Sequence, residues 1–222
     1  MPLLFHRYLQ PEGELGLWKI EEPEAYFLER LDLLEVEQQQ IERIKGHRRL
    51  EWLAGRWLLH LMSGRERRGA CLKDEYGKPY LSESLFDISI SHSRELASVM
   101  AAPRAVGVDV QRIVDKIELI AHKYMRPEEM ASLQAATRLE HLHVYWGAKE
   151  ALYKAYGRKK LDFKSHIFID PFVYDVTLGQ CSGYVKKDQF FQQFKLTYEC
   201  IEGYILVAGM EDLGDLRWAQ TN

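Results

Sequence analysis

The sequence has few cysteines and no long hydrophobic run. Cys71, Cys181 and Cys200 form no CxxC motif and no Cys/His group spaced for zinc, so we expect free thiols rather than a disulfide framework or a zinc site. No stretch approaches 18 apolar residues, so no transmembrane helix is predicted. The N-terminus lacks the uninterrupted apolar segment of a signal peptide. Together these absences predict a cytoplasmic protein that does not enter a membrane.

Neither sign of charge dominates the chain. The net charge of −3 argues against bulk binding of nucleic acid, but residues 43–78 contain ten Lys/Arg and only four acidic residues. A local basic cluster on an acidic protein suits a compact polyanion better than a long one. The alternative for most of these basic residues is an ordinary solvated helix face.

The order of predicted elements indicates an α+β protein. The 222 residues, of which 46% are hydrophobic, are enough for one large domain or two of about 110 residues. Pro103-Arg104 is the best candidate boundary, giving an N-terminal half over 1–103 and a C-terminal half over 104–222. Both halves combine strands with a long helix. This favours two similar α+β halves with a site between them, although no clean internal repeat is visible. The predicted strands are 3–9, 15–20, 86–90, 96–101, 106–110, 167–169, 173–178, 183–186, 194–200 and 204–210, and the predicted helices are 23–32, 35–62 with a break near Gly46, 116–124, 127–136 and 141–156.

The helix over 141–156 contains the most informative segment. At about 100° per residue, small apolar residues occupy one arc, and the remaining residues fall on the opposite arc. The apolar arc comprises Ala148, Ala151, Leu152 and Ala155, and the opposite arc comprises Trp146, Lys149, Glu150, Tyr153 and Lys154. One interpretation is a surface helix with a Glu150/Lys154 pair; the other is a site where a carboxylate lies between two ammonium groups.

A second carboxylate, Asp109, lies on the strand 106–110. Its neighbours Val108 and Val110 are expected to point into the core, and Gly107 permits close approach of another backbone. Asp109 and Glu150 together offer two hard oxygen ligands, which suit Mg²⁺ completed by water and phosphate oxygens.

His92 lies between Ser91 and Ser93 in a segment predicted to be a loop. These side chains could donate hydrogen bonds to a phosphate. The commoner outcome for a lone histidine in such a segment is satisfaction by its own backbone. The chain contains no Gly-x-Ser-x-Gly motif, so the Ser-His pair does not indicate a hydrolase.

Four segments of the chain are informative together: Tyr76-Gly77-Lys78-Pro79, Ile90-Ser91-His92-Ser93, Gly107-Val108-Asp109 and Trp146-x-x-Lys149-Glu150-Ala151-x-x-Lys154. In this order and spacing they resemble the 4′-phosphopantetheinyl transferases. The match is closest to the larger, pseudo-dimeric class found with surfactin synthetase, and it covers residues from about 48 to 154. The resemblance implies a monomer of two halves related by a pseudo-two-fold, with coenzyme A and Mg²⁺ bound in the cleft between them. It also implies transfer of phosphopantetheine to a serine of an apo acyl or peptidyl carrier protein.

The resemblance also implies roles for individual residues. Asp109 and Glu150 would hold Mg²⁺, with Gln111 as a weaker third ligand, and Glu150 would also act as the base for the serine hydroxyl, directly or through a water. Further residues are assigned to coenzyme A. Lys149, Lys154, Ser91 and His92 would contact the diphosphate, Lys78 and Pro79 the adenine and ribose, and Arg48, Arg49 or Arg56 the 3′-phosphate.

Two departures from the family pattern leave alternatives open. Gln111 stands where the family often has glutamate, and Gly147 stands where Ser, Thr or Cys is usual. A coenzyme A or carrier-binding homologue without catalysis is therefore one rival. An Mg²⁺ nuclease is another, although nucleases generally need Glu-x-Lys on one strand. The carrier is not identified by the sequence; the segment 112–126 could dock it or could be an ordinary amphipathic helix.

Overall fold

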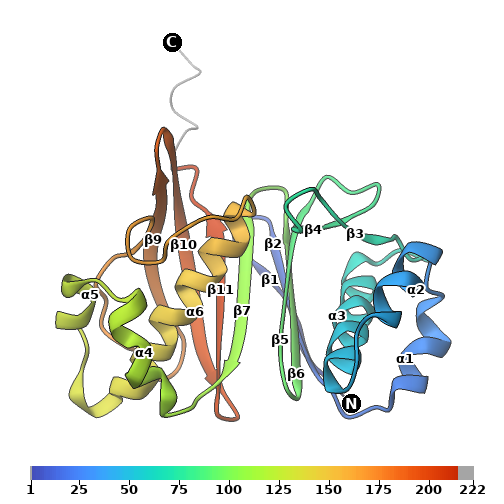
Figure 1. Ribbon diagram of the computed structural model, residues 1–222, viewed down its shortest axis with the longest axis horizontal. Coiled ribbons are helices and arrows are strands. Elements are labelled where there is room, and N and C mark those ends of the chain that lie inside the picture. The colour runs from blue at the N-terminus through green and yellow to red at the C-terminus, as the bar shows by residue number, and fades with distance from the viewer. Residues whose placement is uncertain (1, 215–222) are drawn as a thin grey trace.

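The computed structural model describes residues 2–214, which form two antiparallel β-sheets flanked by helices (Figure 1). The first sheet has six strands in the order β1-β2-β6-β5-β4-β3, and the second has five in the order β7-β11-β10-β9-β8. The predicted N-terminal half includes Met1 and the predicted C-terminal half includes 215–222, and both of these pieces lie outside the described residues. The strands are β1 (Leu3–Leu9), β2 (Gly13–Lys19), β3 (Cys71–Lys73), β4 (Pro79–Leu81), β5 (Asp87–Ser93), β6 (Leu96–Ala102), β7 (Val106–Arg112), β8 (Ile167–Ile169), β9 (Gly179–Lys187), β10 (Phe190–Ile201) and β11 (Tyr204–Glu211).

The helices follow the glycine signals of the sequence. The predicted break near Gly46 is confirmed, because α2 ends at Glu42 and α3 begins at His47. The two longest helices, α3 and α6, both end at a glycine in the left-handed conformation, Gly64 and Gly157. The helices are α1 (Glu24–Leu31), α2 (Glu35–Glu42), α3 (His47–Ser63), α4 (Lys116–Tyr124), α5 (Pro127–Ala131) and α6 (Arg138–Tyr156), with a short 3₁₀ turn at Ala135–Thr137.

Three predicted elements need correction. Residues 173–178 are not a strand, because the Asp175 side chain accepts hydrogen bonds from Thr177 and Leu178 and so forms a local turn. The segment 91–93 is not a loop; it continues β5 and pairs with β6 up to the register Ser93↔Leu96. The helix predicted over 127–136 ends at Ala131.

The core consists of three clusters of buried apolar residues. Helices α1 to α3 bury Phe27, Leu53 and Leu58 against the first sheet, and α4 and α6 pack on the second sheet. The two sheets contact each other through apolar residues such as Leu17 and Val108. In Figure 1 the sheets accordingly stand side by side at the centre, with α1 to α3 on one side and α4 to α6 on the other. The α+β prediction is confirmed, while the pseudo-two-fold stays a prediction.

Strand β5 meets β7 through side chains rather than through a strand ladder. Strand β7 is the edge of the second sheet, so alternate backbone N–H groups have no strand partner. Alternate side chains of β5 accept hydrogen bonds from these groups, always across a separation of 19 residues. This register fixes the position of Ser91 and His92 relative to Asp109. The side-chain oxygens of β5 accept from the backbone N–H groups of β7 in four pairs: Asp87 from Val106 (3.1 Å), Ser89 from Val108 (3.0 Å), Ser91 from Val110 (3.1 Å) and Ser93 from Arg112 (3.4 Å).

Candidate functional site

Asp109, Ser91 and Lys154 converge from three elements, β7, β5 and α6. The Lys154 ammonium lies 2.7 Å from Asp109 Oδ1 and 2.9 Å from Ser91 Oγ. It also donates to the carbonyl oxygen of Val108 at 2.9 Å. The Ser91 hydroxyl donates to the same Asp109 oxygen at 3.1 Å. Asp109 is therefore buried but held by two donors, and Lys154 is fixed in place although it remains partly exposed.

Glu150 lies one helical turn before Lys154 and completes the group. Burial raises the pKa of the Glu150 carboxyl, and the nearby negative charge of Asp109 raises it further, while Lys154 opposes both effects. The Glu150 carboxyl is therefore within electrostatic reach of the Asp109 carboxylate. Gly107 makes this possible, because a Cβ at that position would lie only 1.8 Å from the carbonyl oxygen of Ala151. The close approach of another backbone that the sequence indicated at Gly107 is thus confirmed, and the structure identifies that backbone as α6.

The donor set suits magnesium better than a transition metal. Within residues 2–214 no group of three or more His, Cys, Asp or Glu side chains could hold a metal ion. Mg²⁺ needs fewer protein ligands, since it commonly binds one or two carboxylates and takes its other ligands from water and substrate phosphates. Asp109 and Glu150 are such a pair, and their electrostatic repulsion would be relieved by a divalent cation.

Gln111 is bonded to helix α6. Its amide nitrogen donates to the carbonyl oxygen of His143 at 3.1 Å, and its amide oxygen lies 3.3 Å from Nδ1 of the same residue. A side chain at Gly147 would lie 3.1 Å from the Gln111 amide, so the two departures from the family pattern are neighbours in space. Metal ligation by Gln111 stays a prediction and would require this amide to leave His143.

His92 lies on β5 next to α3, where its side chain is partly exposed. Its Nδ1 is 3.0 Å from Oε2 of Glu51, a carboxylate that is only 7% exposed. Burial lowers the pKa of His92; Glu51 raises it, and the charges of Lys154, Arg56 and Arg48 lower it. The histidine thus lies among cationic groups that come from both α3 and α6.

The three candidate arginines of α3 have different environments. Arg48 is exposed and makes no hydrogen bond or ion pair within the described part of the chain. Arg49 instead binds the Glu24 carboxylate at 2.5 Å and the carbonyl oxygen of Ile41 at 2.7 Å. Arg48 is therefore the member of this set that is accessible to a ligand.

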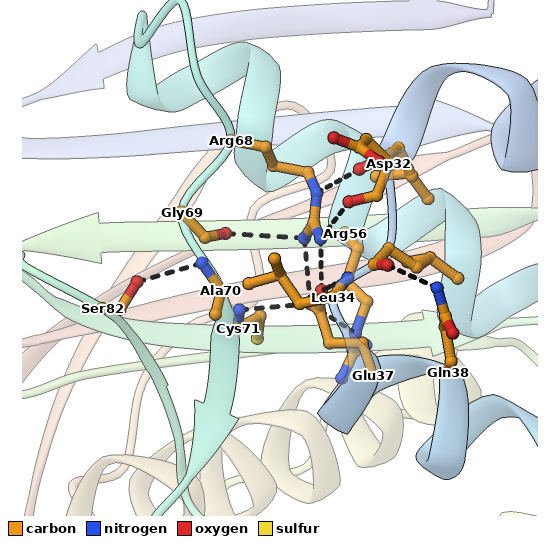
Figure 2. A network of polar contacts seen from close by, with 12 residues as sticks. Asp32, Leu34, Glu37, Gln38, Arg56, Arg68, Gly69, Ala70, Cys71 and Ser82 are labelled. Atoms are coloured by element: carbon orange, nitrogen blue, oxygen red, sulfur yellow. Dashed lines mark hydrogen bonds and ion pairs between the residues drawn. The ribbon is translucent and has the colours of Figure 1, made fainter.

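Arg56 points into the protein rather than toward solvent. Its guanidinium lies 3.4 Å from the centre of the Trp52 ring, and its Nε is 4.0 Å from the Glu37 carboxylate. Burial lowers the pKa of Arg56 to about 10. Figure 2 shows Arg56 beside the network in which Glu37 is paired with Arg68 and accepts from the backbone of Cys71. The structure therefore assigns Arg56 to the junction of α2, α3 and β3, which the sequence did not indicate.

A pocket of about 180 Å³ lies between the β3–β4 turn and the end of α6. Lys78 and Pro79 line one side of it, and Tyr153 and Lys154 line another. The Lys78 ammonium is held by Asp87 at 2.5 Å and by the carbonyl oxygen of Ala155 at 2.9 Å. The predicted Lys78-Pro79 segment and Lys154 are therefore brought to one cavity. The full lining is Tyr76, Gly77, Lys78, Pro79, Ile88, Ser89, Ile90, Tyr153, Lys154, Gly157 and Lys159.

Lys149 does not lie with Asp109, Glu150 and Lys154, which corrects the expectation that it contacts the diphosphate. Its side chain is 0% exposed, and its ammonium lies 2.9 Å from the equally buried Glu129. The ammonium also donates to the carbonyl oxygens of Ile167 at 2.8 Å and Phe163 at 3.0 Å. Lys149 joins α6 to α5 and β8, and it cannot reach a ligand in solvent. The helical arc wrongly placed Lys149 with the exposed residues, because residues after α6 cover this part of the helix.

Sequence reasoning missed Glu51 and Lys159. Glu51 carried a weak signal, since it lies on the buried side of an amphipathic helix where an acidic residue needs a partner. Lys159 follows α6 in a left-handed conformation, with φ of 59°, and lines the pocket. Its position depends on the turn after Gly157 and could not be derived from periodicity.

Comparison with known proteins identifies a matching family and a relative. Residues 105–207 match the family model of the 4′-phosphopantetheinyl transferase superfamily. The 4′-phosphopantetheinyl transferase gsp of Aneurinibacillus migulanus is 29% identical over 113 residues, which are 49% of this chain and 46% of the relative. The chain thus matches about half the length of this curated relative. In the described part of the chain, no helix is long and apolar enough to cross a membrane.

Proposed function

We propose that this chain transfers 4′-phosphopantetheine from coenzyme A to a serine of an apo carrier protein. The match of residues 105–207 to the 4′-phosphopantetheinyl transferase superfamily supports this proposal. The observation that carries the proposal is the convergence of Asp109, Glu150 and Lys154 beside the pocket lined by Lys78 and Pro79. Two carboxylates and an ammonium group next to a small pocket suit a nucleotide diphosphate, for which catalysis consists mainly of positioning and charge neutralisation.

The reaction requires one bond to form and one to break. The serine oxygen of the carrier bonds to the β-phosphorus of coenzyme A, and the bond from that phosphorus to the bridging oxygen breaks, releasing 3′,5′-ADP. Glu150 accepts the serine proton through a water, which its raised pKa favours. Lys154 compensates the negative charge that develops on the diphosphate. Asp109 and Glu150 would hold Mg²⁺, with Gln111 as a third oxygen ligand, and the bound ion would further neutralise the diphosphate.

The substrate is held on the N-terminal side of the site. The pocket at Lys78 and Pro79 takes the adenine and ribose, since it combines apolar walls with polar groups. Arg48 and His92 take phosphate groups of coenzyme A, because both are accessible and cationic groups surround His92. Ser91 contributes by holding Asp109 and Lys154 rather than by direct contact.

The carrier protein docks on helix α4. Lys116 and Lys123 are exposed on this helix, and Leu119 is 72% exposed between them. A pocket of about 450 Å³ continues from Lys123 past Trp146 to Glu150. An acidic carrier helix placed on α4 would direct its serine along this pocket toward the proposed base.

Mass spectrometry of apo carriers incubated with coenzyme A and Mg²⁺ tests the proposal. We expect the carrier to gain the mass of phosphopantetheine, with release of 3′,5′-ADP. Glu150→Gln should reduce the rate by roughly 10²–10⁴-fold while coenzyme A still binds. Glu140→Gln, on the same helix but away from the site, is the control and should retain the wild-type rate. Coenzyme A binding without any release of 3′,5′-ADP, for every carrier tested, would instead favour a non-catalytic binding homologue, the alternative motivated by Gln111.

A further inference from the structure

Glu51 is a buried carboxylate whose two oxygens face two histidines. Its side chain is 9% exposed, its Oε2 lies 3.0 Å from Nδ1 of His92, and its Oε1 lies 3.9 Å from Nε2 of His47. His47 itself is bonded at 2.7 Å to the carbonyl oxygen of Arg94, in the turn after β5. The carboxylate thus connects the first turn of α3 to the end of β5. A buried acid at this place is unexplained by packing alone.

The groups around His92 favour an anion. Arg48 and Arg56 on α3 and Lys154 on α6 all act on His92 through their positive charges. The Glu51 carboxylate opposes these positive charges. Arg48 and His92 are both accessible, so an anion from solvent can reach them.

The contact with Glu51 determines which nitrogen of His92 carries the proton. A carboxylate offers only acceptors, so Nδ1 must be protonated for the 3.0 Å contact to be favourable. In the neutral ring Nε2 is then an acceptor and cannot donate to a phosphate oxygen. His92 can bind an anion through Nε2 only after that nitrogen has also gained a proton.

From this geometry we propose that Glu51 is a positioning residue, which orients His92 through Nδ1 and supports its doubly protonated form, so that binding of a phosphate group at Nε2 takes up a proton. The identity of the phosphate, as part of coenzyme A, rests on the proposed function. The 3′-phosphate and the diphosphate share this chemistry. A consequence is that affinity for the phosphate falls as the pH rises, because the protonated ring becomes scarcer.

The first test uses NMR titration of His92 with inorganic phosphate and needs no transfer activity. The His92 signals are assigned with His92→Gln, and the titration runs from about pH 4.5 to about pH 8.5, because burial lowers the pKa of His92 below the usual histidine range. Phosphate should raise the pKa of His92 in the wild type and in the control Glu66→Gln, which removes an exposed carboxylate elsewhere in the same half. In Glu51→Gln the His92 pKa should be lower, and phosphate should raise it less. An unchanged His92 titration in folded Glu51→Gln would overturn the proposal.

The second test distinguishes the two phosphate sources. Calorimetry in buffers of different ionisation enthalpy measures the protons taken up when coenzyme A or dephospho-coenzyme A binds. Proton uptake with coenzyme A but not with dephospho-coenzyme A would identify the 3′-phosphate as the group at His92. Equal proton uptake with both ligands would identify the diphosphate. In either case Glu51→Gln and His92→Gln should both reduce the uptake. No uptake with either ligand, in a wild-type protein that binds both, would contradict the proposal.

A second variant and a binding measurement separate the role of Glu51 from protein folding and from the proposed function. If Glu51→Gln does not fold, Glu51→Asp serves instead, because it keeps the charge but withdraws the oxygens, and it should weaken the response of His92 to phosphate. A wild-type titration at His92 that responds to inorganic phosphate, together with no binding of coenzyme A, would overturn the proposed function while leaving the role of Glu51 intact.

Discussion

Lys154 and Asp109 form an ion pair of 2.7 Å that joins helix α6 to strand β7. Both residues are expected to act on the same diphosphate, one through its own charge and one through a metal. In the free protein the ammonium occupies the place of a cation beside Asp109. We therefore expect Lys154 to compete with a metal ion until an anionic substrate balances both charges.

Replacement of Lys154 by methionine should separate metal binding from turnover. Lys154→Met removes the competing charge, so the affinity for Mn²⁺ without coenzyme A should rise several-fold, while transfer falls because the diphosphate loses a compensating charge. Electron paramagnetic resonance measures the bound Mn²⁺, and release of 3′,5′-ADP measures turnover. Lys159→Met is the control for metal binding, because its ammonium lies over Gly77 rather than at Asp109. Weaker Mn²⁺ binding in Lys154→Met would contradict the competition.

Gly107 should be intolerant of any side chain. In Gly107→Ala the new methyl group would lie 1.8 Å from the backbone oxygen of Ala151, so β7 and α6 must separate. We expect a loss of unfolding free energy of at least about 1–3 kcal/mol. Gly209, directly opposite Gly107 in the β7–β11 register, is the matched control, because there an added methyl would meet only side-chain atoms at 3.3 Å or more. Urea denaturation of both variants checks this, and equal losses would show that the α6 contact is not the reason.

The buried pair of Lys149 and Glu129 should contribute to stability and not to substrate binding. Lys149→Met leaves the Glu129 carboxylate buried without its cation, and we expect a loss of about 3–5 kcal/mol. Arg138→Met removes an exposed ion pair with Glu118 and should cost under about 1 kcal/mol. Denaturation gives both values. Unchanged stability of Lys149→Met with weakened coenzyme A binding would restore the diphosphate-binding role that the sequence suggested.

His141 should make the fold sensitive to acid. Its ring is fully buried against Tyr145 and Phe172, neither ring nitrogen has a partner in the described structure, and burial lowers its pKa to about 4. The unfolded chain therefore binds a proton at higher pH than the folded protein does. Between about pH 6.5 and pH 4 stability should fall as the pH falls, by up to about 1.4 kcal/mol per pH unit from this group.

The variant His141→Phe should reduce that slope. Phenylalanine matches the aromatic neighbours and carries no proton-binding site, so its stability should vary less with pH over the same range. Thermal unfolding at several pH values measures the difference between the variant and the wild type. Parallel curves for the two proteins would show that another group is responsible for the acid sensitivity.

Much of the local structure could be predicted because its causes are local. The break at Gly46 and the end of α6 at Gly157 follow from backbone conformations that glycine adopts readily. The alternation along β7 places Val108 and Val110 in the contact between the two sheets and Gly107 on the face toward α6, as strand geometry requires. The prediction of a strand at 173–178 failed because the Asp175 side chain offered a competing local hydrogen bond.

The candidate site was only partly predictable. Asp109, Glu150 and Lys154 were identified by motif and do converge, because Gly107 allows the two elements to touch. Arg56 was assigned to the 3′-phosphate only because the family resemblance includes this arginine cluster of α3. Its true surroundings, Trp52 and Glu37, depend on how α2 and β3 fold over α3.

The sequence by itself determined most of the helices and strands, the family motifs and the spacing that places Glu150 one turn from Lys154. Only the tertiary structure decided which charged residues are available to a ligand. Lys149 and Lys154 lie five residues apart on one helix, yet the first is enclosed with Glu129 and the second remains partly open beside Asp109. The physical reason is that the environment of a charge depends on what covers it, and the covering segments, residues 161–167 over Lys149 and β5 beside Lys154, are distant in sequence from the residues they cover.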